Sequence, residues 1–452
     1  MMSIEQRGRI RKILQSKTIG EALDNTTYGM IETLALLPAF IFLSVYIYGY
    51  RMNFIPTEFN TVISPEPFNS FFRDTCISAI AIGFFAVILH AAKKRRDGRA
   101  ENFRSFLKDN MYLVFFAIFY LLMLLTSAVH GFPYAFEGHY YRGESMFTII
   151  CYFAAFMLPL TIVRSPKRRK AVIYSFMVFG IIMGVSMLVK YYYFGIVENR
   201  FVGIYSQFNH YAYFLTIIIS ASAVLMLYEK NLTLRILSAV NFVFSVVLLV
   251  INDTFGAWLS TFAAMILIPV MISLKNRRFT PKALLPLLVY VVLVPSTIFM
   301  MMGGDMENFT TFGDDLMNIL SGDITGAEGT GRLALWEFAA DKIKEEPLLG
   351  QGLEGVSQEM ENTVGNDRCH NEYLQYALAF GIPAAVAYTL GCLFVFLRGL
   401  RLKADLDSTQ IAAFAAAFAY LVSAFAGNSM YYTAPLLFIF MGLACSVCSD
   451  TE

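Results

Sequence analysis

The chain has 452 residues, of which 57% are hydrophobic and only 15% are charged. A water-soluble core of this size cannot bury so many apolar side chains, so the composition excludes an ordinary soluble domain. Lys and Arg total 35 against 34 Asp and Glu, and this even balance gives no sign of a nucleic-acid partner. The sequence therefore predicts an integral membrane protein whose main partner is the lipid bilayer.

Long uncharged segments recur along the chain, and each is close to the roughly 20 residues that an α-helix needs to cross the hydrocarbon layer. They are too long and too uniformly apolar for barrel strands, and backbone groups inside lipid must bond within their own segment. The predicted fold class is therefore all-α, a polytopic membrane protein with about 12 transmembrane helices. The predicted spans are 28–50, 72–92, 111–129, 145–163, 171–195, 209–228, 236–252, 256–274, 283–302, 372–397, 409–427 and 434–448.

The connectors between the spans alternate in charge. Clusters of Lys and Arg follow the second, fourth, eighth and tenth spans, at 93–96, 164–170, 275–278 and 398–403, on the same side as a basic leader. By the positive-inside rule that side is the cytoplasm, and both termini are expected there. The chain then divides into a leader (1–27), nine helices (28–302), a large extracytoplasmic loop (303–371) and three last helices with a short tail (372–452).

Two outer connectors before the large loop carry polar candidates for substrate binding. The stretch HYYRGES contains Arg142, and the stretch ENRFVGIYSQFNHYAYF places Arg200 near Asn209 and His210. Lys190 lies near the outer end of the preceding span, where it either faces the same pocket or extends its ammonium group to the membrane surface.

The large loop is nearly 70 residues long, which exceeds what joining two helices requires, so function is expected to concentrate there. Its stretch GRLALWEFAADKIKEEPLLGQG predicts an amphipathic helix that ends at Glu346–Pro347 and is followed by a turn at Gly350 and Gly352. One face of this helix is expected to hold Leu333, Trp336, Ala340 and Ile343. Trp336 is suited to a membrane interface and is also a weaker candidate for substrate binding.

Two loop residues are candidates for chemistry. Arg332 lies at the start of the amphipathic helix, where free N–H groups favour an anion and the guanidinium fork matches phosphate. His370 comes just before the tenth span. Their alternatives are a solvated or anchoring arginine and a hydrogen-bonded interface histidine. Asn371 and Glu372 are expected to cap the helix that follows, with direct substrate contact by Asn371 as a weaker alternative.

The order of four short motifs resembles the signature of the O-antigen ligase and polymerase superfamily. These motifs are G-R-x-x-x-W at 331–336, P-L-L-G-x-G at 347–352, H-N-x-Y-L-Q at 370–375 and G-I-P at 381–383. Upstream, Arg200, Gly203 and Asn209 are similar to the family's R-x-x-G…N segment. The chain departs from the family pattern at Phe255, where many members carry an arginine.

The resemblance implies a GT-C-like membrane glycosyltransferase in the cytoplasmic membrane of a bacterium. Such enzymes move a glycan from an undecaprenyl-diphosphate carrier to an acceptor hydroxyl, on a glycan or a lipid core, at the outer face of the membrane. On this basis Arg200 and Arg332 stabilise the diphosphate, His370 acts as general base, and neither a metal ion nor another cofactor takes part. A single displacement would invert the anomeric centre.

Three other functions remain open at this stage. A metal-dependent oligosaccharyltransferase of the GT-C class would need an acidic ligand set in its first outer loop, where only Glu58 and Glu66 occur; Asp314 and Asp315 in the large loop are the other acidic pair. A glycan-lipid flippase or a secondary transporter would also span the membrane many times. Transporters generally place ionisable groups near mid-membrane, whereas the acids here lie near the ends of the predicted spans. The motifs do not separate a ligase from a polymerase or from an enzyme that glycosylates protein.

Overall fold

The computed structural model describes residues 4–34, 65–99, 103–136, 138, 144–163, 165–193, 208–301, 331–401, 406–429 and 433–446. Helices dominate these residues, and the described part of the chain contains no strand. The all-α prediction is therefore confirmed for this part.

The described elements follow one another in chain order and include two short 3₁₀ turns. They are α1 (Ile4–Leu14), α2 (Ile19–Asn25), α4 (Pro65–Arg96), α5 (Phe103–Asp109), α6 (Met111–Val129), α7 (Met146–Ile162), α8 (Pro166–Tyr193), α9 (Phe208–Tyr228), α10 (Leu232–Asn252), α11 (Phe255–Asn276), η1 (Pro281–Leu284), α12 (Leu285–Met301), α14 (Arg332–Glu345), α15 (Ser357–Val364), α16 (Glu372–Phe380), α17 (Ile382–Arg401), α18 (Ser408–Ser423), η3 (Ala424–Ala426) and α19 (Ala434–Cys445).

Eight helical segments in the described residues are long and apolar enough to cross a membrane. They are Met111–Val129, Pro166–Val189, Asn209–Tyr228, Leu232–Asn252, Phe255–Asn276, Pro281–Met301, Ile382–Gly399 and Ser408–Ala426. Two shorter apolar helices, α7 and α19, lie at predicted spans as well. Most of the first predicted span, and the large loop before residue 331, lie outside the described residues, so the count of 12 stays a prediction.

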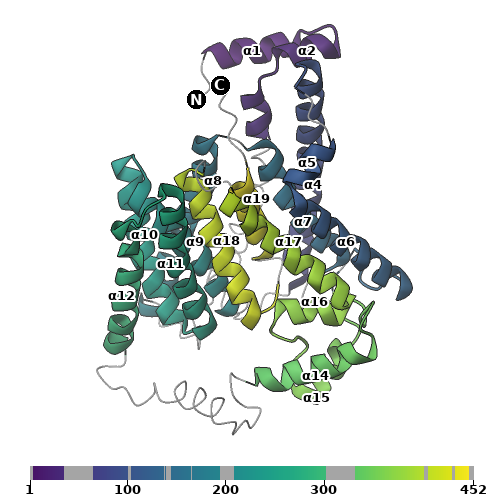
Figure 1. The fold of residues 1–452 in the computed structure, drawn as a ribbon, viewed down its shortest axis with the longest axis vertical. Coiled ribbons are helices and arrows are strands. Elements are labelled where there is room, and N and C mark those ends of the chain that lie inside the picture. The colour runs from purple at the N-terminus through teal and green to yellow at the C-terminus, as the bar shows by residue number, and fades with distance from the viewer. Residues whose placement is uncertain are drawn as a thin grey trace.

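Helices α9 and α18 form the centre of the bundle. They pack against each other, with α10 and α11 on one side and α19 on the other, while α17 packs against α6 (Figure 1). The sequence of α18 explains its central place, because its many alanines allow neighbouring backbones to approach closely. The buried alanines of α18 are Ala412, Ala413, Ala415, Ala416, Ala417 and Ala419.

The leader helices and the described part of the large loop lie at opposite ends of the bundle. Helices α1 and α2 occupy one end in Figure 1, and α14 and α15 occupy the other. At the α1/α2 end, Arg96, the last residue of α4, binds Asp24 of α2 at 2.5 Å, and Arg168 binds Glu32. Of the basic clusters predicted to share one side, the one at 93–96 therefore contacts the leader, and the one at 164–170 contacts the start of the first predicted span. Their assignment to the cytoplasm rests on the positive-inside rule and stays a prediction.

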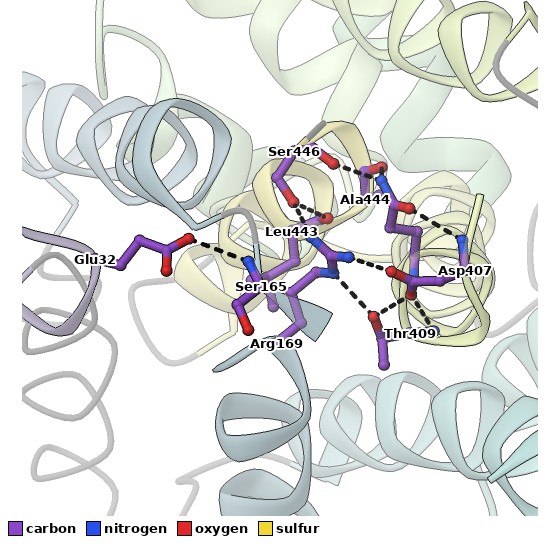
Figure 2. A network of polar contacts seen from close by, with 9 residues as sticks. Glu32, Ser165, Arg169, Asp407, Thr409, Leu443, Ala444 and Ser446 are labelled. Carbon is purple, nitrogen blue, oxygen red and sulfur yellow. Dashed lines mark hydrogen bonds and ion pairs between the residues drawn. The ribbon is translucent and has the colours of Figure 1, made fainter. Parts of the chain in front are cut away.

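A buried arginine joins three helices at the same end. Arg169 of α8 is fully buried and donates to Thr409 Oγ1 (2.9 Å), to Ser446 Oγ (3.0 Å) and to Asp407 (Figure 2). Asp407 also caps α18, since its carboxylate accepts from the backbone N–H of Gln410. The starts of α8 and α18 and the end of α19 thus share one polar network.

The predicted span 372–397 is wrong as a single helix. The structure breaks it at Gly381 into α16 and α17, and of the two only α17 is a candidate span. Gly381 has φ 86°, and a Cβ on it would lie 2.2 Å from the carbonyl oxygen of Leu348. The Ile382 N–H donates to Pro347 O instead (2.9 Å), so the P-L-L-G-x-G segment forces the break.

Helix α14 confirms the predicted amphipathic helix and its end at Glu346. The predicted apolar face is partly wrong, because the buried residues are Leu335, Ala339 and Ile343. Leu333 and Ala340 are only half-buried. Leu335 and Ala339 lie one position before the predicted Trp336 and Ala340, and α14 packs against both α15 and α16.

Candidate functional site

Several helices begin or end around one region at the α14 end of the bundle. Tyr213, in the second turn of α9, donates to the carbonyl of Ser423 at the end of α18 (3.2 Å). The Ser423 hydroxyl lies 2.5 Å from that of Ser260, in the second turn of α11. Helix α14 packs against α16, which starts at the same end. The start of α9, the end of α18 and the start of α16 therefore surround one region.

The P-L-L-G-x-G turn is held by the end of α6. Thr126 Oγ1 donates to Leu349 O (2.8 Å), and His130 Nε2 lies 3.1 Å from Gly350 O. Gly350 has φ 67°, and a Cβ on it would lie 2.6 Å from Gly381 N. The P-L-L-G-x-G and G-I-P motifs, about 30 residues apart, thus pack directly against each other through Gly350 and Gly381. Only glycine tolerates both the positive φ and the lack of space for a Cβ at this contact.

The backbone around His370 is held on both sides. Its φ of 49° lies in the left-handed region, which costs a non-glycine residue about 1–3 kcal/mol and persists only where neighbouring contacts enforce it. Before it, the carbonyl of Cys369 accepts from the Trp336 indole (2.9 Å), and the Cys369 N–H donates to Gln375 Oε1 (3.1 Å). After it, the Asn371 side chain accepts from Leu374 N–H (3.0 Å), so its predicted role as a helix cap is confirmed.

Arg332 is the first residue of α14, directly after Gly331 with φ 78°. It is half-buried, and burial lowers the pKa of its guanidinium, while the nearby Tyr213 hydroxyl acts in the opposite direction. Arg332 and Trp336 are four residues apart and share one face of the helix. Since Trp336 binds the residue before His370, one helix face carries both the cation and the contact that holds the histidine segment.

Asn209 and His210 lie in the first turn of α9, and both are buried. The His210 ring meets that of Tyr213 edge to face, with ring centroids 6.3 Å apart. Tyr213 is also the tyrosine that interacts with Arg332. The structure therefore places this predicted pair near the start of α14.

Three predicted site residues are not tested by the structure. Arg200 and Arg142 lie outside the described residues, and Lys190 belongs to α8 but its side chain is not described. Their roles stay predictions. The described residues also contain no group of three or more His, Cys, Asp or Glu side chains placed to hold a metal ion. Asp314 and Asp315 are outside that part of the chain.

Two buried carboxyl groups near His370 were not predicted. Glu144 accepts from Ser429 Oγ (3.1 Å) and Tyr152 (3.2 Å), and burial raises its pKa to about 7 although Arg368 opposes this. Glu372 was expected to cap α16, but its side chain turns into the bundle, where burial raises its pKa to about 7. No local pattern marks Glu144. For Glu372, the position directly after His370–Asn371 was the only sequence feature that pointed to a role near the site.

A buried ion pair also supports the histidine segment. Arg368, two residues before His370, binds Glu354, and both side chains are almost fully buried. Glu354 adopts φ 63° and accepts from the Ser357 hydroxyl at 2.6 Å. Because Arg368 already has this carboxylate partner, the structure assigns it to holding the loop rather than to binding a substrate anion.

Comparison with known proteins supports the resemblance drawn from the motifs. Residues 240–389 match the family model described as O-antigen ligase. This segment runs from α10 into α17 and contains Arg332, Trp336 and His370. No curated protein matches the chain. The resemblance to the O-antigen ligase and polymerase superfamily is thus confirmed over this segment.

Proposed function

Because residues 240–389 match the O-antigen ligase family, we propose that the protein is a membrane glycosyltransferase of surface polysaccharide synthesis. Its donor is a glycan on undecaprenyl diphosphate, and its acceptor is a hydroxyl of a glycan or a lipid core. The reaction takes place at the extracytoplasmic face of a bacterial cytoplasmic membrane, with both termini in the cytoplasm. The arrangement of α14 against α16, joined by the Trp336–Cys369 bond, carries this proposal.

In the proposed reaction the acceptor oxygen attacks the anomeric carbon while His370 accepts the proton of the acceptor hydroxyl. The bond between the anomeric carbon and the diphosphate oxygen breaks, and undecaprenyl diphosphate leaves with both electrons of that bond. One displacement inverts the configuration at the anomeric carbon. A positioned general base contributes about 10²–10⁴-fold to such a step.

Arg332 and Arg200 stabilise the negative charge that forms on the leaving diphosphate. The half-buried Arg332 is suited to this role, since a partly dehydrated cation interacts more strongly with an anion than a solvated one does. Removing one such contact commonly raises the barrier by about 3–4 kcal/mol. Asn209, His210, Lys190, Arg142 and Asn371 are weaker proposals for contacts to the sugar or the phosphates. Trp336 acts through Cys369.

The test is glycan transfer in reconstituted membranes from a defined undecaprenyl-diphosphate glycan. His370→Ala, Arg332→Ala and Arg200→Ala are compared with the wild type. His90→Ala in α4 and Arg278→Ala after α11 are matched controls, because both side chains lie on elements away from α14 and α16. Loss of transfer in the first three variants and normal transfer in the controls is expected. Normal transfer by a folded His370→Ala protein would refute the assigned base.

Two additions to this experiment separate the remaining possibilities. Transfer that continues in EDTA excludes a dissociable catalytic metal, whereas its loss favours the metal-dependent oligosaccharyltransferases. A panel of acceptors (lipid core, repeat unit and peptide) then distinguishes a ligase from a polymerase and from a protein glycosyltransferase.

A further inference from the structure

Glu372 occupies a position that a helix-terminal acid rarely has. It is the first residue of α16 and the second residue after His370, yet only 1% of its surface is exposed. An acid in the first turn of a helix ordinarily faces water, where it still interacts favourably with the helix dipole. Burying a carboxyl group costs free energy unless hydrogen bonds replace the lost water. A position that served only packing would favour an apolar side chain.

The carboxyl group is held by tyrosines from two other helices. Oε1 accepts from the Tyr388 hydroxyl of α17 at 2.5 Å, and Oε2 accepts from the Tyr420 hydroxyl of α18 at 3.4 Å. The Tyr388 ring in turn meets the Tyr376 ring of α16 edge to face, with centroids 4.7 Å apart. Both α17 and α18 contain candidate membrane spans. Glu372 therefore ties the first turn of α16 to the membrane-spanning bundle.

This anchor complements the contacts on the other side of His370. Cys369 is held from α14 by Trp336, whereas the Asn371 cap is local to α16 and does not fix that helix relative to its neighbours. The left-handed backbone of His370 links these two parts. If the first turn of α16 shifted, the residue between them would relax toward an ordinary conformation and carry the imidazole with it.

We propose that Glu372 is a positioning residue for His370. Its carboxyl group accepts hydrogen bonds from Tyr388 and Tyr420, holds the start of α16 and thereby keeps the imidazole where the acceptor hydroxyl arrives. No proton passes through Glu372 in this role. The inference rests on the proposed function, in which His370 is the base, but its structural part is measurable without substrate.

The experiment measures amide hydrogen exchange of segment 369–375 and glycan transfer in the same reconstituted full-length protein. In Glu372→Ala we expect exchange in this segment to rise about tenfold or more, and kcat to fall by a similar factor while the donor KM changes little, because the hydrogen bonds from Tyr388 and Tyr420 are lost. Glu372→Gln keeps a side-chain oxygen for Tyr388 and should stay near wild type in both. Glu361→Ala in α15, an exposed position, is the matched control.

A second variant covers the case in which Glu372→Ala fails to fold. Tyr388→Phe removes the 2.5 Å hydrogen bond and keeps the ring, and it should also raise exchange in segment 369–375. Tyr290→Phe removes a comparable 2.8 Å bond to Trp258 O and should not. Unchanged exchange in the folded Glu372 and Tyr388 variants would overturn the positioning role. If exchange rises in the Glu372 and Tyr388 variants but His370→Ala transfers glycan normally, Glu372 still positions the segment. In that case His370 is not the general base.

Discussion

The indole N–H of Trp336 donates a 2.9 Å hydrogen bond to the carbonyl oxygen of Cys369, the residue before His370. Trp336 is one helical turn after Arg332, so this bond joins the element that carries the proposed phosphate contact to the segment that carries the proposed base. This bond therefore ties Arg332's helix to the segment of His370, and we expect it to help fix how the two side chains are placed.

Replacing Trp336 with Phe should therefore lower transfer without unfolding the protein. Phe keeps most of the ring packing but cannot donate, so we expect kcat to fall about tenfold and the free energy of unfolding to fall by about 1 kcal/mol. Trp258→Phe is the matched control, because the Trp258 indole donates a 3.0 Å bond to Leu249 O on other helices. Equal losses of kcat in the two variants would contradict the specific role of Trp336. Transfer kinetics and thermal unfolding in detergent provide the measurement.

The contact between Gly350 and Gly381 predicts a steric effect that can be separated from backbone strain. In Gly350→Ala the new Cβ meets Gly381 N at 2.6 Å, whereas in Gly365→Ala nothing lies within 4 Å. Both glycines have positive φ, 67° and 73°, so both variants carry the strain of about 1 kcal/mol, and only the first carries the clash. We expect the free energy of unfolding of Gly350→Ala to be about 1–3 kcal/mol lower than that of Gly365→Ala. Similar melting temperatures for the two would show that the motifs do not interlock.

The network around Arg169 should affect stability but not substrate binding. Arg169→Ala removes bonds to Asp407, Thr409 and Ser446, and truncating one partner of a buried ion pair commonly costs about 3–5 kcal/mol. The network lies beside the Arg168–Glu32 contact at the α1/α2 end of the bundle, opposite α14 in Figure 1, so the donor KM of the folded fraction should be unchanged. Arg277→Ala, at an exposed position, is the control. A raised donor KM in Arg169→Ala without a loss of stability would show that the network affects substrate binding instead of stability.

The buried Glu144 predicts that stability falls as pH rises. Burial raises its folded-state pKa from 4.5 to about 7, with Arg368 and Ser429 acting in the opposite direction. A raised folded pKa means that the protonated acid stabilises the fold below pH 4.5 and that this contribution is lost as pH rises through 7. The difference of about 2.5 pKa units corresponds to at most about 3–4 kcal/mol.

Glu144→Gln removes the titrating group. Its melting temperature should therefore depend less on pH between about 5 and 8 than that of the wild type does. Glu361→Gln, an exposed substitution, should follow the wild-type curve. Identical pH dependence in wild type and Glu144→Gln would show that Glu144 does not titrate in this range.

Much of the helical architecture could be predicted because its causes are local. The span 111–129 matches α6 residue for residue, since an uncharged run of the right length has no alternative to a helix in lipid. The end of α14 at Glu346, the turn at Gly350 and Gly352 and the Asn371 cap follow from equally local chemistry. The order of the motifs likewise predicted the family that the comparison supports.

The sequence by itself thus determined that the protein is a helical membrane protein, where most of its described helices lie, and which superfamily its motifs resemble. Only the tertiary structure decided that the helix after His370 breaks at Gly381, that Trp336 binds Cys369, and that Glu144 and Glu372 are buried beside tyrosines. Hydropathy and helix caps depend on neighbours along the chain. The partner of a buried polar group depends instead on which helices meet, and residues far apart in sequence supply it.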